Sequence, residues 1–306
     1  MKRRPLGRTG LSVPEIGFGC GPTAGLMVRG DAKTRRDVVA RALELGIDYF
    51  DTAPAYGATQ SEQNLGATLR ALGAKPLIAT KIVLELGDLA DIPGAVTRSV
   101  EGSLARLGVE RLDLVQLHNR VASSRAPKAD IGTGAMLTVD DVLAANGVVP
   151  TLERLRARGL VAHLGCCAYG GEPAAVETLI DSGAFETVLI YYSLLNQSAF
   201  DPCPAGLRDY ARLGARAAAA GMSVIALRAF DGGALIDHPP AALTRLAETE
   251  GMELPVLALR FVLSNESIAT SLVGFSNLAQ VEAAAAAAAA GKLPTELIRR
   301  ARSWQG

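Results

Sequence analysis

The chain has 306 residues, 49% of them hydrophobic and 20% charged, which is typical of a soluble globular protein with a large core. Its 31 basic and 31 acidic residues balance and only 5% are aromatic, so neither nucleic acid nor an anionic membrane is indicated as a partner. No apolar run approaches the ~18 residues that span a bilayer, and no signal peptide follows the basic start. Four cysteines without a C-x-x-C pair favour a reduced, cytoplasmic protein.

Hydrophobic periodicity, glycine and proline divide the chain into alternating strands and helices. Residues 1–14 are expected to form a hairpin that turns at residues 7–10. The predicted strands cover residues 15–20, 48–53, 76–82, 112–118, 163–167, 187–192, 223–229 and 271–275. The predicted helices cover residues 31–45, 61–73 with Ser61 as the N-cap, 92–107, 151–158, 173–182, 205–220, 240–250, 254–263, 277–290 and 295–304.

Eight strands that alternate with helices predict a parallel sheet. Length alone leaves two domains open, but no change in composition marks a boundary. The sequence therefore predicts one α/β domain over residues 1–306, a (β/α)8 TIM barrel with an N-terminal β-hairpin and extra C-terminal helices.

The long connection over residues 119–149 is polar at first and carries glycines later. Loops of this length without structure of their own are usually functional lids or disordered segments. Because this one leaves the strand end that carries His118, a loop on the substrate side is one reading. A surface insertion without a role is the other.

Polar side chains stand where three neighbouring strands end. Asp51 follows the second strand, Lys81 ends the third and His118 ends the fourth, while Tyr56 lies in the turn after Asp51. Taken singly, Asp51 could cap a helix and Tyr56 could be a packing residue. In a barrel of this kind the carboxyl ends of the strands form the active site, so the four side chains are expected together.

These four residue types suit proton transfer to a carbonyl oxygen. An ammonium beside a phenol is expected to lower the phenol's pKa, and a carboxylate would hold that ammonium charged and oriented. A neutral imidazole can donate a hydrogen bond to the same oxygen. A hydride would have to come from a cofactor, because no side chain supplies one.

The chain resembles the aldo-keto reductase family over nearly its whole length. The resemblance is carried by short motifs, namely Leu6-Gly7-Arg8-Thr9-Gly10-Leu11-Ser12-Val13, residues 46–53 with Tyr56-Gly57, Ser61-Glu62 with Leu65-Gly66, Ser103-Leu104, Arg106-Leu107-Gly108, Asp113-Leu114 and His118. It implies a (β/α)8 barrel that binds a nicotinamide nucleotide, NAD(P)H, across the strand ends without a Rossmann fold. By motif match the catalytic tetrad of the family falls on Asp51, Tyr56, Lys81 and His118, with Tyr56 as general acid/base.

The resemblance also assigns residues to the cofactor, but several depart from the family pattern. Cys167 and Ala168 stand where a Ser-Asn pair often holds the nicotinamide carboxamide, and Leu189 stands where Gln is frequent. Tyr192 remains as a surface for the nicotinamide ring. The other assigned positions near the strand ends are Gly19, Cys20, Asp51 and Arg228, although Arg228 could also be a plain surface charge.

The segment Gly274–Glu282 matches the family's adenosine-phosphate loop and contributes Gly274, Phe275, Ser276, Gln280 and Glu282. Free N–H groups at a helix N-terminus suit phosphate. Members that prefer NADP usually add Lys or Arg here, whereas residues 269–291 contain neither. Glu282 could bond a free ribose 2′-hydroxyl, so NAD is expected to serve at least as well as NADP.

The leading hypothesis is an NAD(P)-dependent oxidoreductase that interconverts a small aldehyde, ketone or sugar lactol and its alcohol or lactone, working as a monomer or homodimer. A non-catalytic nucleotide-binding scaffold or sensor of the same fold is the alternative. A metal-dependent hydrolase is disfavoured, because the chain has three histidines and His163 begins its strand. Metal ligands are therefore not predicted. Phe18, Tyr169 and Trp304 are candidate walls of the substrate pocket, or else core residues.

Overall fold

A computed structural model describes residues 1–126, 133–203 and 205–304. Eight parallel strands close into a barrel in the order β10-β11-β12-β3-β4-β5-β6-β9, so each strand pairs with its sequence neighbours in the ring. The barrel strands are β3 (Ile16–Gly19), β4 (Tyr49–Asp51), β5 (Leu77–Ile82), β6 (Leu112–Leu117), β9 (Val161–Cys167), β10 (Thr187–Tyr191), β11 (Ser223–Leu227) and β12 (Ile268–Gly274). The predicted (β/α)8 TIM barrel is confirmed.

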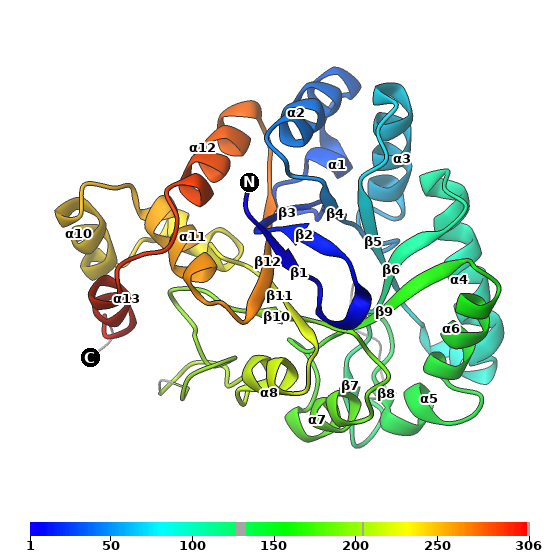
Figure 1. The fold of residues 1–306 in the computed structure, drawn as a ribbon. Coiled ribbons are helices and arrows are strands. Elements are labelled where there is room, and N and C mark those ends of the chain that lie inside the picture. The colour runs from blue at the N-terminus through cyan, green and yellow to red at the C-terminus, as the bar shows by residue number, and fades with distance from the viewer. Residues whose placement is uncertain (127–132, 204, 305–306) are drawn as a thin grey trace.

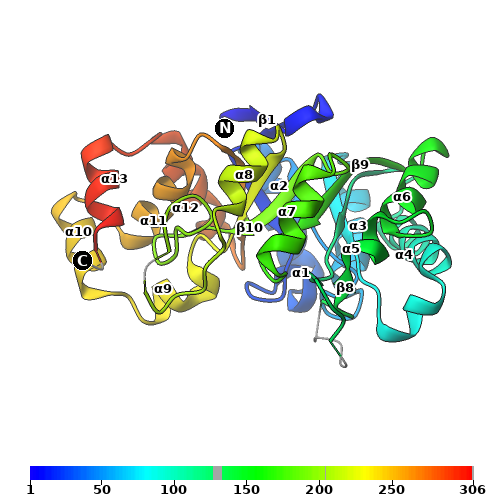
Figure 2. The ribbon, with the colours of Figure 1, turned by 90° about the horizontal axis from the view of Figure 1, so that it is seen from below.

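An antiparallel hairpin lies across one opening of the barrel (Figure 1). It pairs β1 (Arg3–Pro5) with β2 (Ser12–Pro14) and turns through η1 (Gly7–Thr9), as the sequence predicts. Its buried Leu6 and Val13 belong to the apolar cluster inside the barrel. Because the hairpin closes the end where the strands begin, the loops that follow the strands open on the opposite side (Figure 2).

Alternation along the strands separates two apolar layers. Residues that point inward form a small cluster in the barrel, including Tyr49, Leu114, Leu189 and Ile225. Their strand neighbours point outward and form the large layer under the helices. Polar residues that share the inward face therefore come together at the open end.

Helices surround the barrel (Figure 1). The longer ones are α2 (Ala32–Glu44), α3 (Gln60–Leu72), α4 (Ile92–Leu107), α6 (Val148–Ala157), α7 (Pro173–Asp181), α8 (Leu213–Ala219), α10 (Ala241–Thr249), α11 (Leu254–Ser264), α12 (Leu278–Ala289) and α13 (Thr295–Arg302). None of the helices in the described ranges is long and apolar enough to cross a membrane.

Several predicted boundaries were wrong. The helix predicted over residues 205–220 is reduced to α8, because the preceding residues fold around the buried Ser198, whose Oγ accepts the Tyr210 N–H at 3.0 Å. Ser61 is not the N-cap of α3, since that position belongs to Thr59. Ser61 is instead buried in the first turn, where its hydroxyl donates to the Cys20 carbonyl at 2.9 Å.

Four short helical segments close to the strand ends carry too few residues for a periodic pattern. These are α1 (Leu26–Arg29), η2 (Leu86–Ala90), η3 (Asp231–Gly233) and α9 (Ala234–Asp237). Each occupies a loop that follows a barrel strand, so they line the open end rather than the helical layer.

The long connection after β6 is not structureless where it is described; its residues 127–132 lie outside the described ranges. It contains the strand pair β7 (Val121–Ala122) and β8 (Leu137–Thr138), followed by α5 (Val139–Leu143). Asn119, fully buried, fastens it to the loop after β5. Its side chain bonds the Leu84 N–H and C=O at 2.9 and 2.8 Å and the Ala135 C=O at 2.9 Å.

Candidate active site

A buried ion pair lies where β4 and β5 end. The Lys81 ammonium donates to Asp51 Oδ1 and, at 2.8 Å, to the Thr52 carbonyl. Lys81 is 0% exposed and Asp51 is 2% exposed. Burial opposes the charged form of Lys81, but the attraction of the Asp51 carboxylate, together with smaller contributions from Tyr56 and Cys167, outweighs it and raises the pKa of Lys81. The ammonium therefore stays charged in the barrel mouth.

Gln116 completes this pair, and the sequence analysis missed it. Its Nε2 donates to Asp51 Oδ2 at 2.7 Å, and the side chain is fully buried. Both oxygens of Asp51 thus have a donor. Strand alternation could have revealed it, because Gln116 stands two residues before His118 and so shares its inward face.

Tyr56 is held by an unusual turn after β4. Gly57, Ala58 and Thr59 all have left-handed backbones, with φ of 62°, 49° and 75°. A side chain at Gly57 would also come 2.5 Å from Val28 Cγ1, so only glycine fits there. Such strain in consecutive residues is typical of functional sites. The turn places the Tyr56 ring 4.8 Å from Lys81 Nζ, measured to the ring centroid.

Lys81 lowers the pKa of Tyr56, as expected, but the net shift is upward. Burial raises the pKa of Tyr56 to about 12, and the nearby ammonium of Lys81 offsets only part of that rise. Desolvation of the phenolate raises the pKa of Tyr56 by more than the charge of Lys81 lowers it, because the Asp51 carboxylate partly cancels that charge. Tyr56 is therefore a protonated phenol at neutral pH.

His118 faces Tyr56 edge-on, with ring centroids 6.0 Å apart. Burial, and after it the charge of Lys81, lowers the pKa of His118 to about 3, so the imidazole is neutral. Its Nδ1 is buried without a hydrogen-bond partner in the part of the chain that the structure describes. The predicted four side chains are thus brought together, and the arrangement offers a phenol and a neutral imidazole to one small space.

The residues assigned to a nucleotide phosphate gather beside this group. Gly274 pairs with Gly19 at the ends of β12 and β3, and α12 begins just beyond. A side chain on Gly274 would come 2.8 Å from Ala24 Cβ, so the backbone is left bare there. The Ser276 N–H donates to Gln280 Oε1 at 2.7 Å, which fixes the start of the helix.

Glu282 is less available to bond a ribose 2′-hydroxyl than the sequence suggests. Its carboxylate accepts from Arg41 Nε of α2 at 2.9 Å, and Arg41 also bonds Glu44. Residues 269–291 carry no Lys or Arg, yet a neighbouring helix brings one to Glu282. That contact joins helices far apart in the sequence and could not be read from a local motif.

Some assigned side chains face the core. Phe275 packs edge-on against Phe18, and Phe18 stacks on Phe50. Cys20 is also buried, and its N–H donates to the Asp51 carbonyl at 2.9 Å. Phe275 could therefore offer a ligand only its backbone, whereas the Cys20 N–H and carbonyl are already bonded to Asp51 and Ser61. Phe18 is not a pocket wall.

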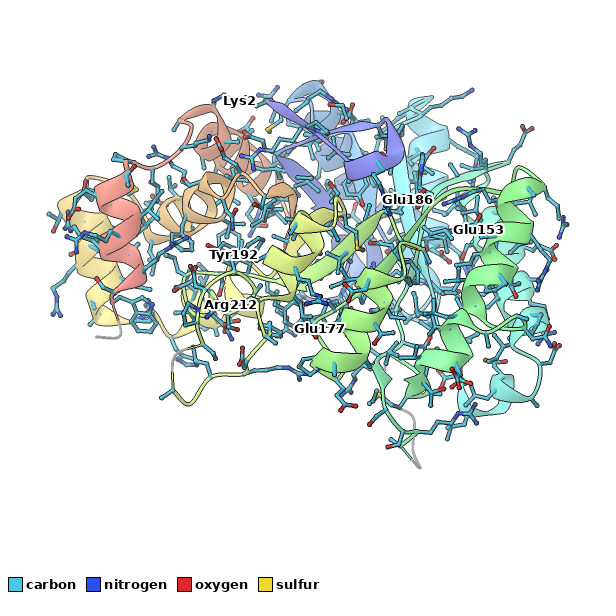
Figure 3. All side chains as sticks on the ribbon, turned by 60° about the horizontal axis from the view of Figure 1, so that its bottom comes forward. Lys2, Glu153, Glu177, Glu186, Tyr192 and Arg212 are labelled. Carbon is cyan, nitrogen blue, oxygen red and sulfur yellow. The ribbon has the colours of Figure 1, made fainter. Side chains whose placement is uncertain are left out.

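Tyr192 does not face the site, contrary to the prediction. Its ring is 1% exposed and packs against Phe200 and Phe261, beneath α11. Figure 3 shows it inside the layer of helices. Tyr191, one residue earlier, faces the barrel mouth and stacks on Tyr169 at 4.4 Å. The strand's alternation, with Leu189 inward, would have favoured Tyr191.

Cys167 and Arg228 lie at the ends of β9 and β11. Cys167 is 5% exposed in the interior cluster, and burial raises the pKa of its thiol to about 12, although the charge of Lys81 acts in the opposite direction. Arg228 is exposed and covers the face of Tyr191. Trp304 donates its indole N–H to the Leu194 carbonyl at 2.9 Å and packs at the edge of the core.

Known proteins resemble this chain along its length. Over 91% of this chain and 85% of the relative, it is 28% identical to an L-galactose dehydrogenase of Arabidopsis thaliana. It is 24% identical to a pyridoxal 4-dehydrogenase of Microbacterium luteolum over 92% and 91% of the two chains. It is also 24% identical to a D-threo-aldose 1-dehydrogenase of a Pseudomonas species over 89% and 88%.

The fold is similar to that of a solved aldo-keto reductase from Bacillus halodurans in its holo form. The two superpose with a TM-score of 0.77 at 24% identity, over 99% of this chain and 96% of the other. The sequence model of the Aldo/keto reductase family matches residues 15–305. The chain therefore belongs to the aldo-keto reductase family.

Proposed function

We propose that the protein is an NAD(P)-dependent oxidoreductase that interconverts a small aldehyde, ketone or sugar lactol and its alcohol or lactone. The observation that carries the proposal is the Tyr56 phenol beside a fully buried Lys81–Asp51 pair, with a neutral His118 facing the same space. The dehydrogenases among its relatives support a sugar or another small carbonyl compound as substrate.

The residues fit a nicotinamide nucleotide. The bare backbone at Gly19 and Gly274, with the start of α12 next to it, suits a phosphate group through N–H donors. The bound nucleotide would supply or accept the hydride. NAD is expected to serve at least as well as NADP, since the loop itself carries no cation for a 2′-phosphate.

The protein's own side chains would transfer the proton to and from the substrate oxygen. In reduction, Tyr56 donates its phenolic proton to the carbonyl oxygen, and the Lys81 ammonium stabilises the phenolate that remains. His118 donates an N–H to the same oxygen and orients it. In oxidation the phenolate of Tyr56 takes the proton from the alcohol. Asp51 and Gln116 act by positioning Lys81.

Replacement of Tyr56 by Phe tests the proposal. Turnover of a panel of aldehydes, sugars and alcohols should fall by about 10²–10⁴-fold in kcat. The Kd for NADH and NADPH, measured by fluorescence titration, should stay the same. Undiminished turnover would show that Tyr56 is not the acid. Nucleotide binding without turnover of any substrate in the wild-type protein would favour the scaffold or sensor role instead.

A further inference from the structure

Gly21 lies directly beside the hydroxyl end of Tyr56. It follows Cys20, just past the end of β3, in the loop that leads to α1. A Cβ atom at Gly21 would lie 3.8 Å from Tyr56 Cε2 and 3.9 Å from Cζ, the carbon that bears the hydroxyl. Apart from its neighbours in the chain, no other described atom would lie within 4 Å of that Cβ. The missing side chain therefore leaves a space that the Tyr56 phenol borders.

Two other sides of the Tyr56 ring are occupied. Lys81 Nζ lies 4.8 Å from the ring centroid, and the His118 ring meets it edge-on at 6.0 Å. Lys81 is fully buried, whereas Tyr56 and Gly21 are both partly exposed. The space beside Gly21 is therefore open to solvent, while the space at Lys81 is not.

Hydrogen bonds fix the backbone around Gly21. The Cys20 N–H donates to the Asp51 carbonyl at 2.9 Å, and the Cys20 carbonyl accepts the Ser61 hydroxyl at 2.9 Å. On the other side, the Gly25 N–H donates to the Gly21 carbonyl at 3.3 Å. These bonds hold Gly21 in place relative to β4 and α3.

The rest of this loop packs against the turn that carries Tyr56. A Cβ on Gly57 would come 2.5 Å from Val28 Cγ1 of α1, so helix and turn are in close contact. Asn64 Nδ2 of α3 donates to the Met27 carbonyl of α1 at 2.8 Å. Figure 2 shows α1 on the side of the barrel opposite the hairpin. The loop after β3 is therefore a fixed wall of the open end.

The backbone does not require glycine at position 21. Its φ lies outside the left-handed region, unlike that of Gly25 or Gly57. A Cβ there would make only contacts of ordinary van der Waals length. Since the fold would accept a side chain at this position, its absence bears on the site rather than on the turn.

The space has a definite consequence for a carbonyl substrate. Its oxygen must come within about 2.6–3.2 Å of the Tyr56 hydroxyl for the proton to pass. Besides that oxygen, the reacting carbon carries one non-hydrogen substituent in an aldehyde and two in a ketone or lactol. The second substituent needs room next to the phenol, and a side chain at position 21 would take up that room.

We propose that Gly21 determines substrate specificity by admitting a reacting carbon with two non-hydrogen substituents, so that the enzyme acts on ketones and lactols as well as on aldehydes. The inference rests on the proposed function, in which Tyr56 exchanges a proton with the substrate oxygen. Gly21 takes no part in that exchange; it leaves the approach to the hydroxyl open.

Substrates that differ by one methyl group on the reacting carbon test this assignment. Benzaldehyde is compared with acetophenone, and propanal with butanone, by kcat/KM in the wild type and in the Gly21→Leu and Gly21→Ala variants. The wild type should reduce both members of each pair. The ketone-to-aldehyde ratio should fall by about tenfold or more in Gly21→Leu, because loss of room for a methyl group discriminates on that scale. Gly21→Ala, the smaller change, should lower the ratio less and serves alone if Gly21→Leu fails to fold.

Gly87→Leu is the matched control. Gly87 lies in η2, in the loop after β5, and is exposed. Its φ is also outside the left-handed region, and a Cβ there would meet no described atom within 4 Å. This variant should keep the wild-type ratio. A fall as large as that in Gly21→Leu would show that the effect is not specific to the space beside Tyr56.

Nucleotide titration separates a role towards the substrate from one towards the nucleotide. The Kd values for NADH and NADPH should be the same in the wild type and in both Gly21 variants. If the Kd values rise while kcat/KM for aldehydes and ketones falls by one common factor, Gly21 contacts the nucleotide and the proposal is overturned. An unchanged ratio in the variants, or a wild type that reduces aldehydes but no ketone, also overturns it.

A binding measurement makes the test independent of turnover. On protein saturated with NADH, which cannot accept a hydride, calorimetry compares 1-phenylethanol with benzyl alcohol. Gly21→Leu should weaken the binding of 1-phenylethanol by about tenfold more than that of benzyl alcohol. Equal weakening of the two would refute the role of Gly21. The expected difference in binding, without turnover of any carbonyl compound by the wild type, would leave the role of Gly21 standing and refute the proposed oxidoreductase activity.

Discussion

The Lys81 ammonium lies 4.8 Å from the centroid of the Tyr56 ring while the Asp51 carboxylate accepts its hydrogen bond. The buried Lys81 ammonium thus interacts with both Asp51 and Tyr56. In the proposed reaction, Asp51 keeps the Lys81 ammonium charged, and Tyr56 relies on that charge when its own proton leaves. Because Lys81 and Asp51 are shielded from water, their interaction is stronger than it would be at the surface.

Replacing Lys81 by Met should slow turnover strongly and destabilise the fold. The loss of the ammonium removes the stabilisation of the phenolate, so kcat should fall by about 10²–10⁴-fold. The Asp51 carboxylate would remain buried without its cation, at a cost of about 3–5 kcal/mol in the free energy of unfolding. Denaturant unfolding and steady-state kinetics measure the two effects.

The double variant Asp51→Asn with Lys81→Met is the control for that experiment. It removes both charges, so much of the lost stability should return while turnover stays low. Full stability in the single Lys81→Met variant would contradict the burial of a charged Asp51.

The pH dependence of the two directions should differ. Below a pKa of about 12, Tyr56 is protonated, which is the form that reduction needs. The kcat for reduction should therefore stay level between about pH 6 and 9, while that for oxidation should rise with pH, since it needs the phenolate. Because the pKa of His118 is about 3, no inflection from an imidazole is expected near its ordinary value of about 6.5. An oxidation rate that levels off near neutral pH would mean that a different base accepts the proton.

Gln116→Leu should slow the reaction although Gln116 lies behind Asp51. The change leaves Asp51 Oδ2 without its donor at 2.7 Å, which should cost about 1–3 kcal/mol of stability and lower kcat by roughly tenfold. Thr187→Val is a matched control, because the Thr187 hydroxyl is buried without a partner among the described residues. That variant should be as stable and as active as the wild type. Equal effects of the two substitutions on stability and on kcat would show that Gln116 is only a packing residue.

Glu282→Gln should change the choice of nucleotide. The substitution removes a negative charge and frees Arg41 from its 2.9 Å contact. Binding of NADPH should tighten by several-fold, since an opposite charge attracts the 2′-phosphate, while binding of NADH should hardly change. Fluorescence titration gives both Kd values, and Glu44→Gln, which removes the other partner of Arg41, serves as the control. Tighter binding of NADPH than of NADH by the wild type would already refute the expected NAD preference.

Local signals in the sequence determined the architecture and the proposed catalytic group. The eight strand patterns predicted the closed barrel, because alternating helices and strands admit few other folds. Asp51, Lys81 and His118 were found for a related reason, since each ends a strand and the barrel brings all strand ends to one side.

The tertiary structure decided what those residues experience and which neighbours join them. Burial, which no motif records, raises the pKa of Tyr56 by more than Lys81 lowers it. Contacts between segments far apart in the chain pair Glu282 with Arg41 and bring Arg228 onto Tyr191. Side-chain direction along β10 places Tyr191 at the barrel mouth, where Tyr192 had been expected, and turns Tyr192 towards Phe261. Charge, desolvation and aromatic contact depend on distances through space, so they could be settled only once the chain was folded.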